Sequence, residues 1–177
     1  AKMGGQIKVA HSIGEGDVKK ARAFAAGAFQ MGVTIILACI LLVVCGHQLM
    51  IDVFQFTDKK IHGDAVEYLL ITGTAGIFFN TINQVFIGIY TGTGDSKSPF
   101  LATVVGLILN LILDPVLIFG FGPIPAMNVA GAAIATAGSQ GVVTLLFIIL
   151  SKKQKHFFVG IPVFQKPHWE YLRQIWR

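Results

Sequence analysis

The sequence alternates between long apolar stretches and short polar connections. Four stretches are nearly free of charge and are predicted to span a membrane, over about residues 18–50, 65–91, 98–120 and 129–151. A helix needs about 20 apolar residues to cross about 30 Å of hydrocarbon. Because a backbone in lipid has to satisfy its own hydrogen bonds, each stretch is predicted to be a helix. The expected fold class is therefore all-α, a polytopic transmembrane helical bundle.

The connections agree with this division. Gly14-Glu15-Gly16-Asp17 is predicted to be a turn that caps the first long helix. Residues 91–98 form a polar turn rich in glycine, and Pro99 suits the first turn of the helix that follows. The run from Gly120 to Pro125 contains two glycines and two prolines and is not expected to continue a helix.

Lysine and arginine are distributed unequally between the two sides of these spans. With alternating connections, one side carries Lys2, Lys8, Lys19, Lys20, Arg22, Lys97, Lys152, Lys153, Lys155, Lys166, Arg173 and Arg177. The other side carries only Lys59 and Lys60. Cytoplasmic loops hold the excess of positive charge. Segment 1–22, loop 91–98 and tail 151–177 are therefore predicted to be cytoplasmic, in a multi-pass protein of a plasma membrane such as the bacterial inner membrane.

Composition excludes several other classes of function. Only 13% of residues are charged and the mean hydropathy is +0.68, whereas soluble domains average about 25% charged residues. The net charge of +5 follows from the topology, so no nucleic acid is expected as a partner. Cys39, Cys45 and the five histidines match no metal-site spacing. We expect no cofactor and no enzymatic activity, because Asp114 has no second ionisable partner within the spans.

Asp114 is the feature of the spans that most requires an explanation. It lies four residues after Asn110 in the third span, so both side chains are expected on one helical face. Pro115 follows directly and is expected to break the helical hydrogen bonding by leaving the carbonyl of Leu111 without its usual donor. Carboxylate, amide and carbonyl oxygens suit a small hard cation or a proton. The alternative is that Asn110 and Asp114 only bridge neighbouring helices.

Further polar side chains lie in the second and fourth spans. Asn80 and Gln84 share one face of the second span, and Thr136 and Gln140 share one face of the fourth. Polar stripes on several helices can line a wet cavity, which makes Asn80, Gln84 and Gln140 candidates for a substrate pathway. Interhelical hydrogen bonding is the alternative interpretation for each of them.

The residues around these positions resemble a known family. The run Leu109-Asn110-Leu111-Ile112-Leu113-Asp114-Pro115-Val116-Leu117-Ile118-Phe119-Gly120, followed by Val129-Ala130-Gly131-Ala132-Ala133-Ile134-Ala135-Thr136, is similar to the MATE (multidrug and toxic compound extrusion) family. The turns Ser12-Ile13-Gly14-Glu15-Gly16-Asp17 and Gly92-Thr93-Gly94-Asp95-Ser96-Lys97-Ser98-Pro99 also resemble it. The resemblance covers nearly the whole chain.

This resemblance implies an architecture. Members have two six-helix lobes, so residues 1–155 would be a partial amino-terminal lobe. Residues 156–177 would be a cytoplasmic linker with the start of an amphipathic helix, leading to a second lobe that is missing here. Both ends of the sequence look like cuts, and we interpret it as a piece of a longer protein. The resemblance also implies a coupling-ion site, H⁺ or Na⁺, at Asp114, Asn110 and Thr136, completed by an aspartate on a missing first helix.

The resemblance further implies a function. Family members are antiporters that export organic, often cationic, drugs and toxic compounds in exchange for H⁺ or Na⁺ by alternating access. The expected partners are small organic substrates, the lipid bilayer, and the missing helices and second lobe. Two alternatives remain: a lipid-linked oligosaccharide flippase of the same superfamily, and a non-transporting membrane fragment. Flippases often line their cleft with lysine or arginine, and the interiors of these spans contain neither.

Overall fold

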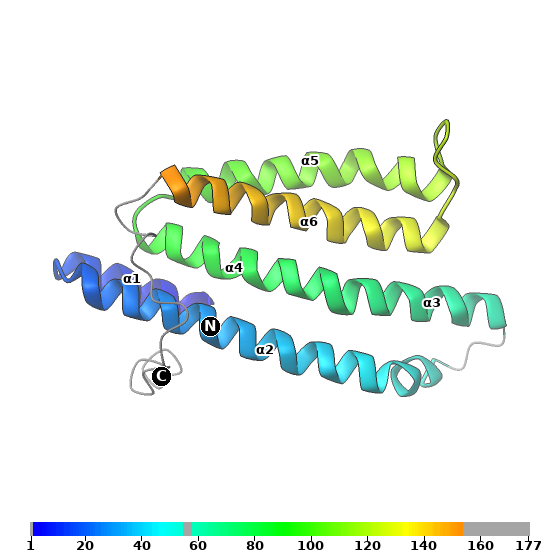
Figure 1. The fold of residues 1–177 in the computed structure, drawn as a ribbon, viewed down its shortest axis with the longest axis horizontal. Helices are drawn as coiled ribbons and strands as arrows, with labels where there is room; N and C mark the ends of the chain where they lie inside the picture. The colour runs from blue at the N-terminus through cyan, green and yellow to red at the C-terminus, as the bar shows by residue number, and fades with distance from the viewer. Residues whose placement is uncertain (1, 55–57, 154–177) are drawn as a thin grey trace. The chain divides into compact units, whose positions relative to one another are not determined.

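The structure is a computed structural model that describes residues 2–54 and 58–153. Its elements in chain order are α1 (Lys2–Gly14), α2 (Val18–Asp52), α3 (Lys59–Ile71), the π-helical turn η1 (Thr72–Gly76), α4 (Ile77–Gly92), α5 (Lys97–Phe119) and α6 (Asn128–Lys153) (Figure 1). The amphipathic helix predicted within residues 156–177 lies outside the described residues. The all-α fold class is confirmed for the part of the chain that the structure describes.

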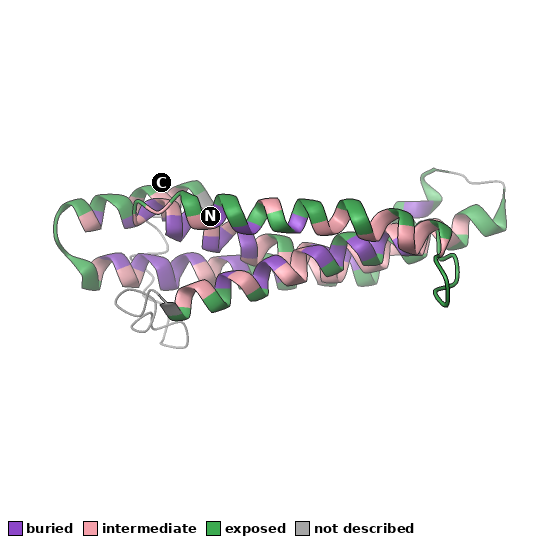
Figure 2. Cartoon of the chain, turned by 90° about the horizontal axis from the view of Figure 1, so that it is seen from above, coloured by how far each residue is buried: buried purple, intermediate pink, exposed green. Residues whose placement is uncertain are grey.

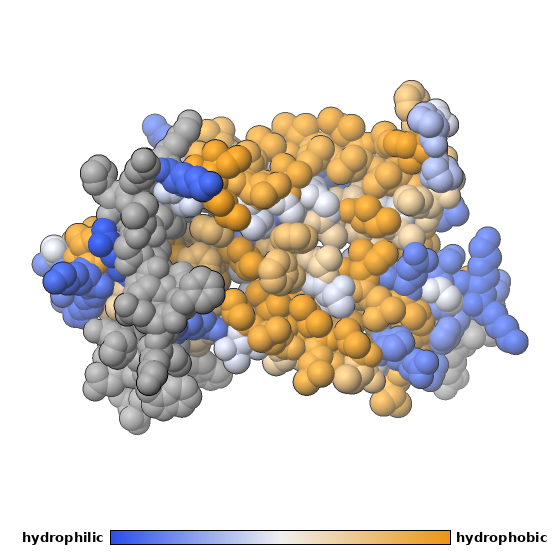
Figure 3. Space-filling model, viewed as in Figure 1, coloured by the Kyte–Doolittle hydropathy of each residue, from blue (hydrophilic) through white to orange (hydrophobic). Residues whose placement is uncertain are grey.

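Four helical segments are long and apolar enough to cross a membrane: Val18–Asp52, Lys59–Gly92, Lys97–Phe119 and Asn128–Lys152. Large apolar side chains on them remain exposed, such as Leu41 at 65% and Leu111 at 72%. Figure 3 shows apolar side chains over the spanning helices and hydrophilic residues near their ends. Exposed apolar surface on this scale indicates a lipid environment, and the prediction of four membrane-spanning helices is confirmed.

The second span differs from a regular helix. Its helical part begins at Lys59, and the α-helical hydrogen bonding is interrupted by η1 before it resumes at Ile77. The sequence analysis predicts one apolar span over residues 65–91 without this interruption. In the third span, by contrast, α5 continues through Pro115. It ends at Phe119, and the run from Gly120 to Pro125, which was predicted not to be helical, follows directly.

The turn between α1 and α2 is fixed by polar contacts outside the spans. The backbone N–H of Lys20 donates to the Asp17 carboxylate at 2.9 Å, and the Lys20 ammonium donates to Glu15 at 3.1 Å. This hydrogen bond from Lys20 holds the pKa of the Glu15 carboxyl below its usual value. Because the lowered pKa favours the charged form in the folded turn, the contact stabilises the turn above the ordinary pKa of glutamate. That contribution is lost as the pH falls through the lowered pKa.

The chain forms two compact units, and each spanning helix contributes to both. Among the described residues, unit 1 contains 2–35, Thr81–Thr103 and 143–153. A first cluster in its core consists of Val9, Ala21, Phe24, Ala25, Ala28, Val85 and Ile89. Small residues allow α1 to approach its neighbours closely, since a Cβ on Gly92 would lie 2.9 Å from the backbone oxygen of Gln6.

A second cluster in unit 1 joins α4 to α6. The rings of Phe86 and Phe147 stack with centroids 5.4 Å apart, and Tyr90 lies 5.7 Å from Phe147. Beside these rings the hydroxyl of Thr144 donates to the side-chain oxygen of Asn83 at 2.8 Å. Both side chains of this Asn83–Thr144 pair are buried. Unit 1 therefore combines aromatic packing with a buried hydrogen bond between two spans.

Unit 2 contains Ile36–Asn80 and Val104–Val142. Here α5 and α6 approach so closely that a Cβ on Gly131 would lie 2.6 Å from the carbonyl carbon of Leu117. The connection between them folds back on itself through an isolated bridge between Phe121 and Ile124. The backbone N–H of Met127 then donates to the carbonyl oxygen of Leu117 at 2.9 Å. These contacts fix the end of α5 that follows Asp114.

The contact at Gly131 predicts that Gly131→Ala destabilises the full-length protein. A methyl group would overlap backbone atoms of α5, and overpacking of this kind costs about 1–3 kcal/mol. Gly138→Ala on the same helix is the matched control, because nothing lies within 4 Å of a Cβ there. Thermal unfolding in detergent should show a lower midpoint for Gly131→Ala alone. Equal midpoints for the two variants would contradict the close approach.

The Asn83–Thr144 pair predicts a measurable coupling between α4 and α6. Interhelical hydrogen bonds in membranes contribute about 0.6–2 kcal/mol. In a double-mutant cycle, the effects of Asn83→Leu and Thr144→Val on the free energy of unfolding should therefore depart from additivity by about the same amount. Thr103→Val is the control, because the Thr103 hydroxyl donates to Pro99 within its own helix at 2.8 Å. Additive effects on unfolding would show that the pair contributes no coupling energy.

Candidate coupling-ion site

Asn110 and Asp114 meet on α5, as their spacing predicts. The side-chain nitrogen of Asn110 donates to a carboxylate oxygen of Asp114 at 3.3 Å. Both side chains are half-buried within unit 2. Asn110 and Asp114 are about one helical turn apart, so the backbone of α5 itself brings their side chains together. The amide of Asn110 is the partner that the structure gives the carboxylate, whose oxygens are chemically able to accept a proton or a cation.

Pro115 adds a backbone acceptor near this pair. Proline has no N–H, so the carbonyl of Leu111 loses the donor that a regular helix would supply. The helix nevertheless continues from Asp114 to Phe119. Its far end is fixed by the close approach of Gly131 and by the hydrogen bond from Met127 to Leu117. The break in hydrogen bonding thus lies between a carboxylate and a firmly packed helix end.

Thr136, the third residue of the predicted ion site, lies on α6. Its side chain is exposed on α6, and its backbone oxygen accepts a hydrogen bond from the Ser139 hydroxyl at 2.9 Å. Within the described residues no hydrogen bond joins the Thr136 hydroxyl to Asn110 or Asp114. The participation of all three in one ion site remains a prediction.

The candidates for a substrate pathway fall in both units. Asn80 is exposed and Gln140 is half-buried, and both belong to unit 2. Gln84 is half-buried in unit 1, and its buried side-chain oxygen has no hydrogen-bond partner among the described residues. An amide oxygen without a partner is costly in an apolar setting, so Gln84 keeps an unused acceptor. Their role in a pathway remains a prediction.

The pair on α5 does not by itself complete a cation site. A hard divalent cation takes about six oxygen ligands, and Na⁺ is likewise bound by several oxygens. Asn110 and Asp114 supply two side chains. In residues 2–54 and 58–153 no group of three or more histidine, cysteine, aspartate or glutamate side chains is placed to hold a metal ion. A proton needs only the carboxylate, whereas a sodium ion would need further oxygens.

Two features with a bearing on function are not evident from the spacing of residues. The Asn83–Thr144 pair joins positions 61 residues apart on two different spans. The turn η1 coincides with the run Thr72-Gly73-Thr74-Ala75-Gly76. Its small and hydroxyl-bearing residues are the signal that could have indicated a weak helical turn.

Comparison with known proteins extends these observations. The sequence profile described as MatE matches residues 1–116. The probable multidrug resistance protein NorM of Thermotoga maritima is 29% identical over 183 residues, which cover 100% of this chain and 38% of that protein. The chain therefore spans about 38% of the length of that relative.

Solved structures agree with the sequence comparison. A structure described as the inward-facing conformation of a multidrug resistance MATE family transporter of the MOP superfamily has a TM-score of 0.85 and 25% identity. The outward-facing conformation of such a transporter has a TM-score of 0.84 and 26% identity. Each similarity covers 98% of this chain and 38% of the other chain. With four apolar spans, an Asn110–Asp114 pair and a profile match over most of its length, the chain belongs to the MatE family of membrane transporters.

Proposed function

We propose that the full-length protein is an antiporter that exports organic, often cationic, compounds in exchange for H⁺ or Na⁺. The observation that carries this proposal is the contact between Asn110 and Asp114 beside Pro115, inside an otherwise apolar helix. Ionisable groups within membrane spans are expensive and mark ion and substrate pathways. Relatives described as multidrug resistance transporters support transport rather than enzymatic catalysis.

Coupling at Asp114 has a simple physical basis. An ionised carboxylate is unfavourable in an apolar setting, and a bound proton or sodium ion removes that cost. The ion therefore stabilises whichever conformation encloses the carboxylate, and the exported compound has to favour the other one. Structures of relatives in inward-facing and outward-facing conformations support alternating access as the mechanism.

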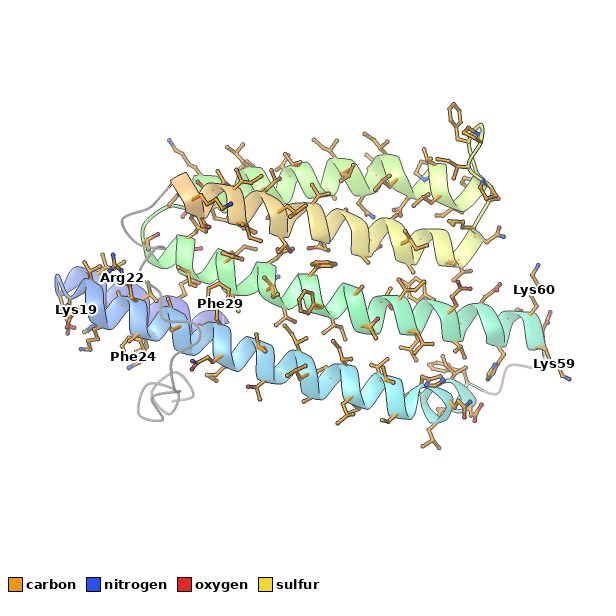
Figure 4. All side chains as sticks on the ribbon, in the orientation of Figure 1. Lys19, Arg22, Phe24, Phe29, Lys59 and Lys60 are labelled. Atoms are coloured by element: carbon orange, nitrogen blue, oxygen red, sulfur yellow. The ribbon has the colours of Figure 1, made fainter. Side chains whose placement is uncertain are left out.

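The charge distribution supports cationic or neutral compounds as substrates. Lysine and arginine in the described spans lie near helix ends, as Lys19, Arg22, Lys59 and Lys60 do in Figure 4. An anionic pyrophosphate group would find no cationic partner in the interior of these four helices. This favours drug export over the flippase alternative. The excess of positive charge on segment 1–22, loop 91–98 and tail 151–177 supports a cytoplasmic location for them.

Asp114→Asn is expected to uncouple transport from the ion gradient. An amide of the same size keeps the shape but binds neither H⁺ nor Na⁺ strongly, and ion couplings are typically about 5–150-fold. The rate of efflux of a fluorescent cationic drug from cells carrying the full-length protein should fall by a factor within about this 5–150-fold range. Asp64→Asn on α3 is the control and should leave efflux unchanged. Undiminished efflux at equal protein levels in Asp114→Asn would contradict the proposed role.

Pro115→Ala is expected to weaken the dependence on the coupling ion. Alanine supplies the missing N–H for the carbonyl of Leu111 and regularises α5 beside the carboxylate. Ion flux stimulated by substrate in proteoliposomes of the full-length protein measures this dependence directly. Pro99→Ala is the control, because N–H groups in the first turn of a helix have no helical acceptor. Wild-type ion dependence in Pro115→Ala would show that the helix break is not required.

A further inference from the structure

The π-helical turn η1 is the most unusual backbone feature of the described chain. The backbone N–H of Ile77 donates to the carbonyl of Thr72, five residues earlier, and also to that of Thr74. Such a turn holds one residue more than the α-helical turn that it replaces. Single π-turns inside α-helices are frequently found at functional sites, and this one has no role in the ion site proposed above.

Side chains in η1 weaken the helix further. The Thr72 hydroxyl donates to the carbonyl of Tyr68 at 2.7 Å, and the Thr74 hydroxyl donates to that of Leu70 at 2.5 Å. Hydroxyls that bond back to the preceding turn in this way tend to bend helices. Gly73 and Gly76 add backbone freedom, since glycine disfavours the helix interior. The turn therefore concentrates several causes of local bending.

The helix before this turn is weakly held. Among the described residues of α3 none is buried, and Figure 2 shows its residues as exposed or intermediate. Its first turn is capped by Asp58, which accepts a hydrogen bond from the backbone N–H of Lys60 at 2.8 Å. In Figure 4, Lys59 and Lys60 point away from the helix. Within this chain α3 therefore buries little surface, and few contacts of the chain itself oppose a change in its position.

Two contacts within unit 2 connect this region to α2. Gly73 lies so close to Val43 that a Cβ there would be 2.7 Å from a methyl carbon of Val43. Near the start of α3, the Nε2 atom of His62 lies 3.3 Å from a carboxylate oxygen of Asp52, with the two side chains 37% and 67% exposed. Exposed pairs of this kind contribute little to stability. The firm contact is thus at the turn and the weak contact is at the far end of α3.

We propose that η1 is a hinge about which α3 swings relative to the part of α2 in unit 2. The close approach of Gly73 to Val43 is the pivot. The contact between His62 and Asp52 is the one that breaks when α3 swings away from α2. The hinge does not depend on the transport function proposed above, because it follows from the packing of α3 alone.

Distances between spin labels in the full-length protein test the hinge. Labels at Leu49→Cys on α2 and Ile61→Cys on α3 occupy exposed positions, after Cys39 and Cys45 are replaced by alanine. Pulsed electron paramagnetic resonance then reports the distribution of distances between α2 and the start of α3. A hinge predicts a broad or bimodal distribution for the otherwise native protein. A single narrow distance would overturn the proposal.

Variants in η1 identify the hinge as the source of this breadth. Gly76→Ala reduces backbone freedom without a clash, because a Cβ there would lie 3.6 Å from Thr72, and it should narrow the distribution. Gly63→Ala on α3, with nothing within 4 Å of a Cβ, is the matched control and should leave it broad. Deletion of Ala75 would restore a regular α-helix and should narrow the distribution most, provided that the variant folds.

The outcomes separate the hinge from general flexibility and from transport. Equal narrowing by Gly76→Ala and Gly63→Ala would place the motion along α3 and overturn the hinge at η1. No narrowing by Gly76→Ala would also overturn it. Loss of ion-coupled efflux in Asp114→Asn with an unchanged distance distribution would leave the hinge intact, so the two proposals fail independently.

Discussion

In hydrocarbon there is no water to bond to a backbone N–H or carbonyl group, and every other feature of this chain follows from that constraint. Each crossing has to be a helix that satisfies its own backbone. The four apolar spans meet the constraint in most of their length. The places where they depart from it are Pro115, which removes a donor, and η1, which changes the hydrogen-bond pattern. Both departures mark positions where function or movement is expected.

The same solvent decides how the helices are held together. Burial of an apolar side chain offers little gain when the alternative is lipid, so close packing and interhelical hydrogen bonds become more important. Gly131 against Leu117 and Gly92 against Gln6 are close approaches of this kind. The Asn83–Thr144 pair supplies a buried hydrogen bond between α4 and α6. Leucine and phenylalanine, by contrast, remain abundant on the exposed surface.

The proposed coupling site needs more oxygen ligands than Asn110 and Asp114 supply. Asn110 and Asp114 contact each other because a helical turn brings them together. A carboxylate that binds a cation needs further oxygens, and the chain covers about 38% of the length of its relative. The remaining ligands would have to come from helices outside this sequence. Within the described chain, Asp114 is therefore a carboxyl group with one amide partner.

Local features of the site and fold could be predicted from the sequence, because they depend on periodicity and on the chemistry of neighbouring residues. Charge-free stretches predicted the four spans, and a spacing of four residues predicted the contact of Asn110 with Asp114. Glycine and proline after Phe119 predicted the end of α5. Each of these results is set within one helix or one turn, where the backbone alone fixes the geometry.

The tertiary structure decided what depends on the packing of distant segments. Thr136, Asn83 and Thr144 are all polar residues within the spans. The fold exposes Thr136 and buries the other two as a hydrogen-bonded pair. It also introduces η1 where Gly73 meets Val43 of another helix. A polar residue in a span needs a partner, but which partner it finds is determined by the helix that packs against it, and no local pattern contains that information.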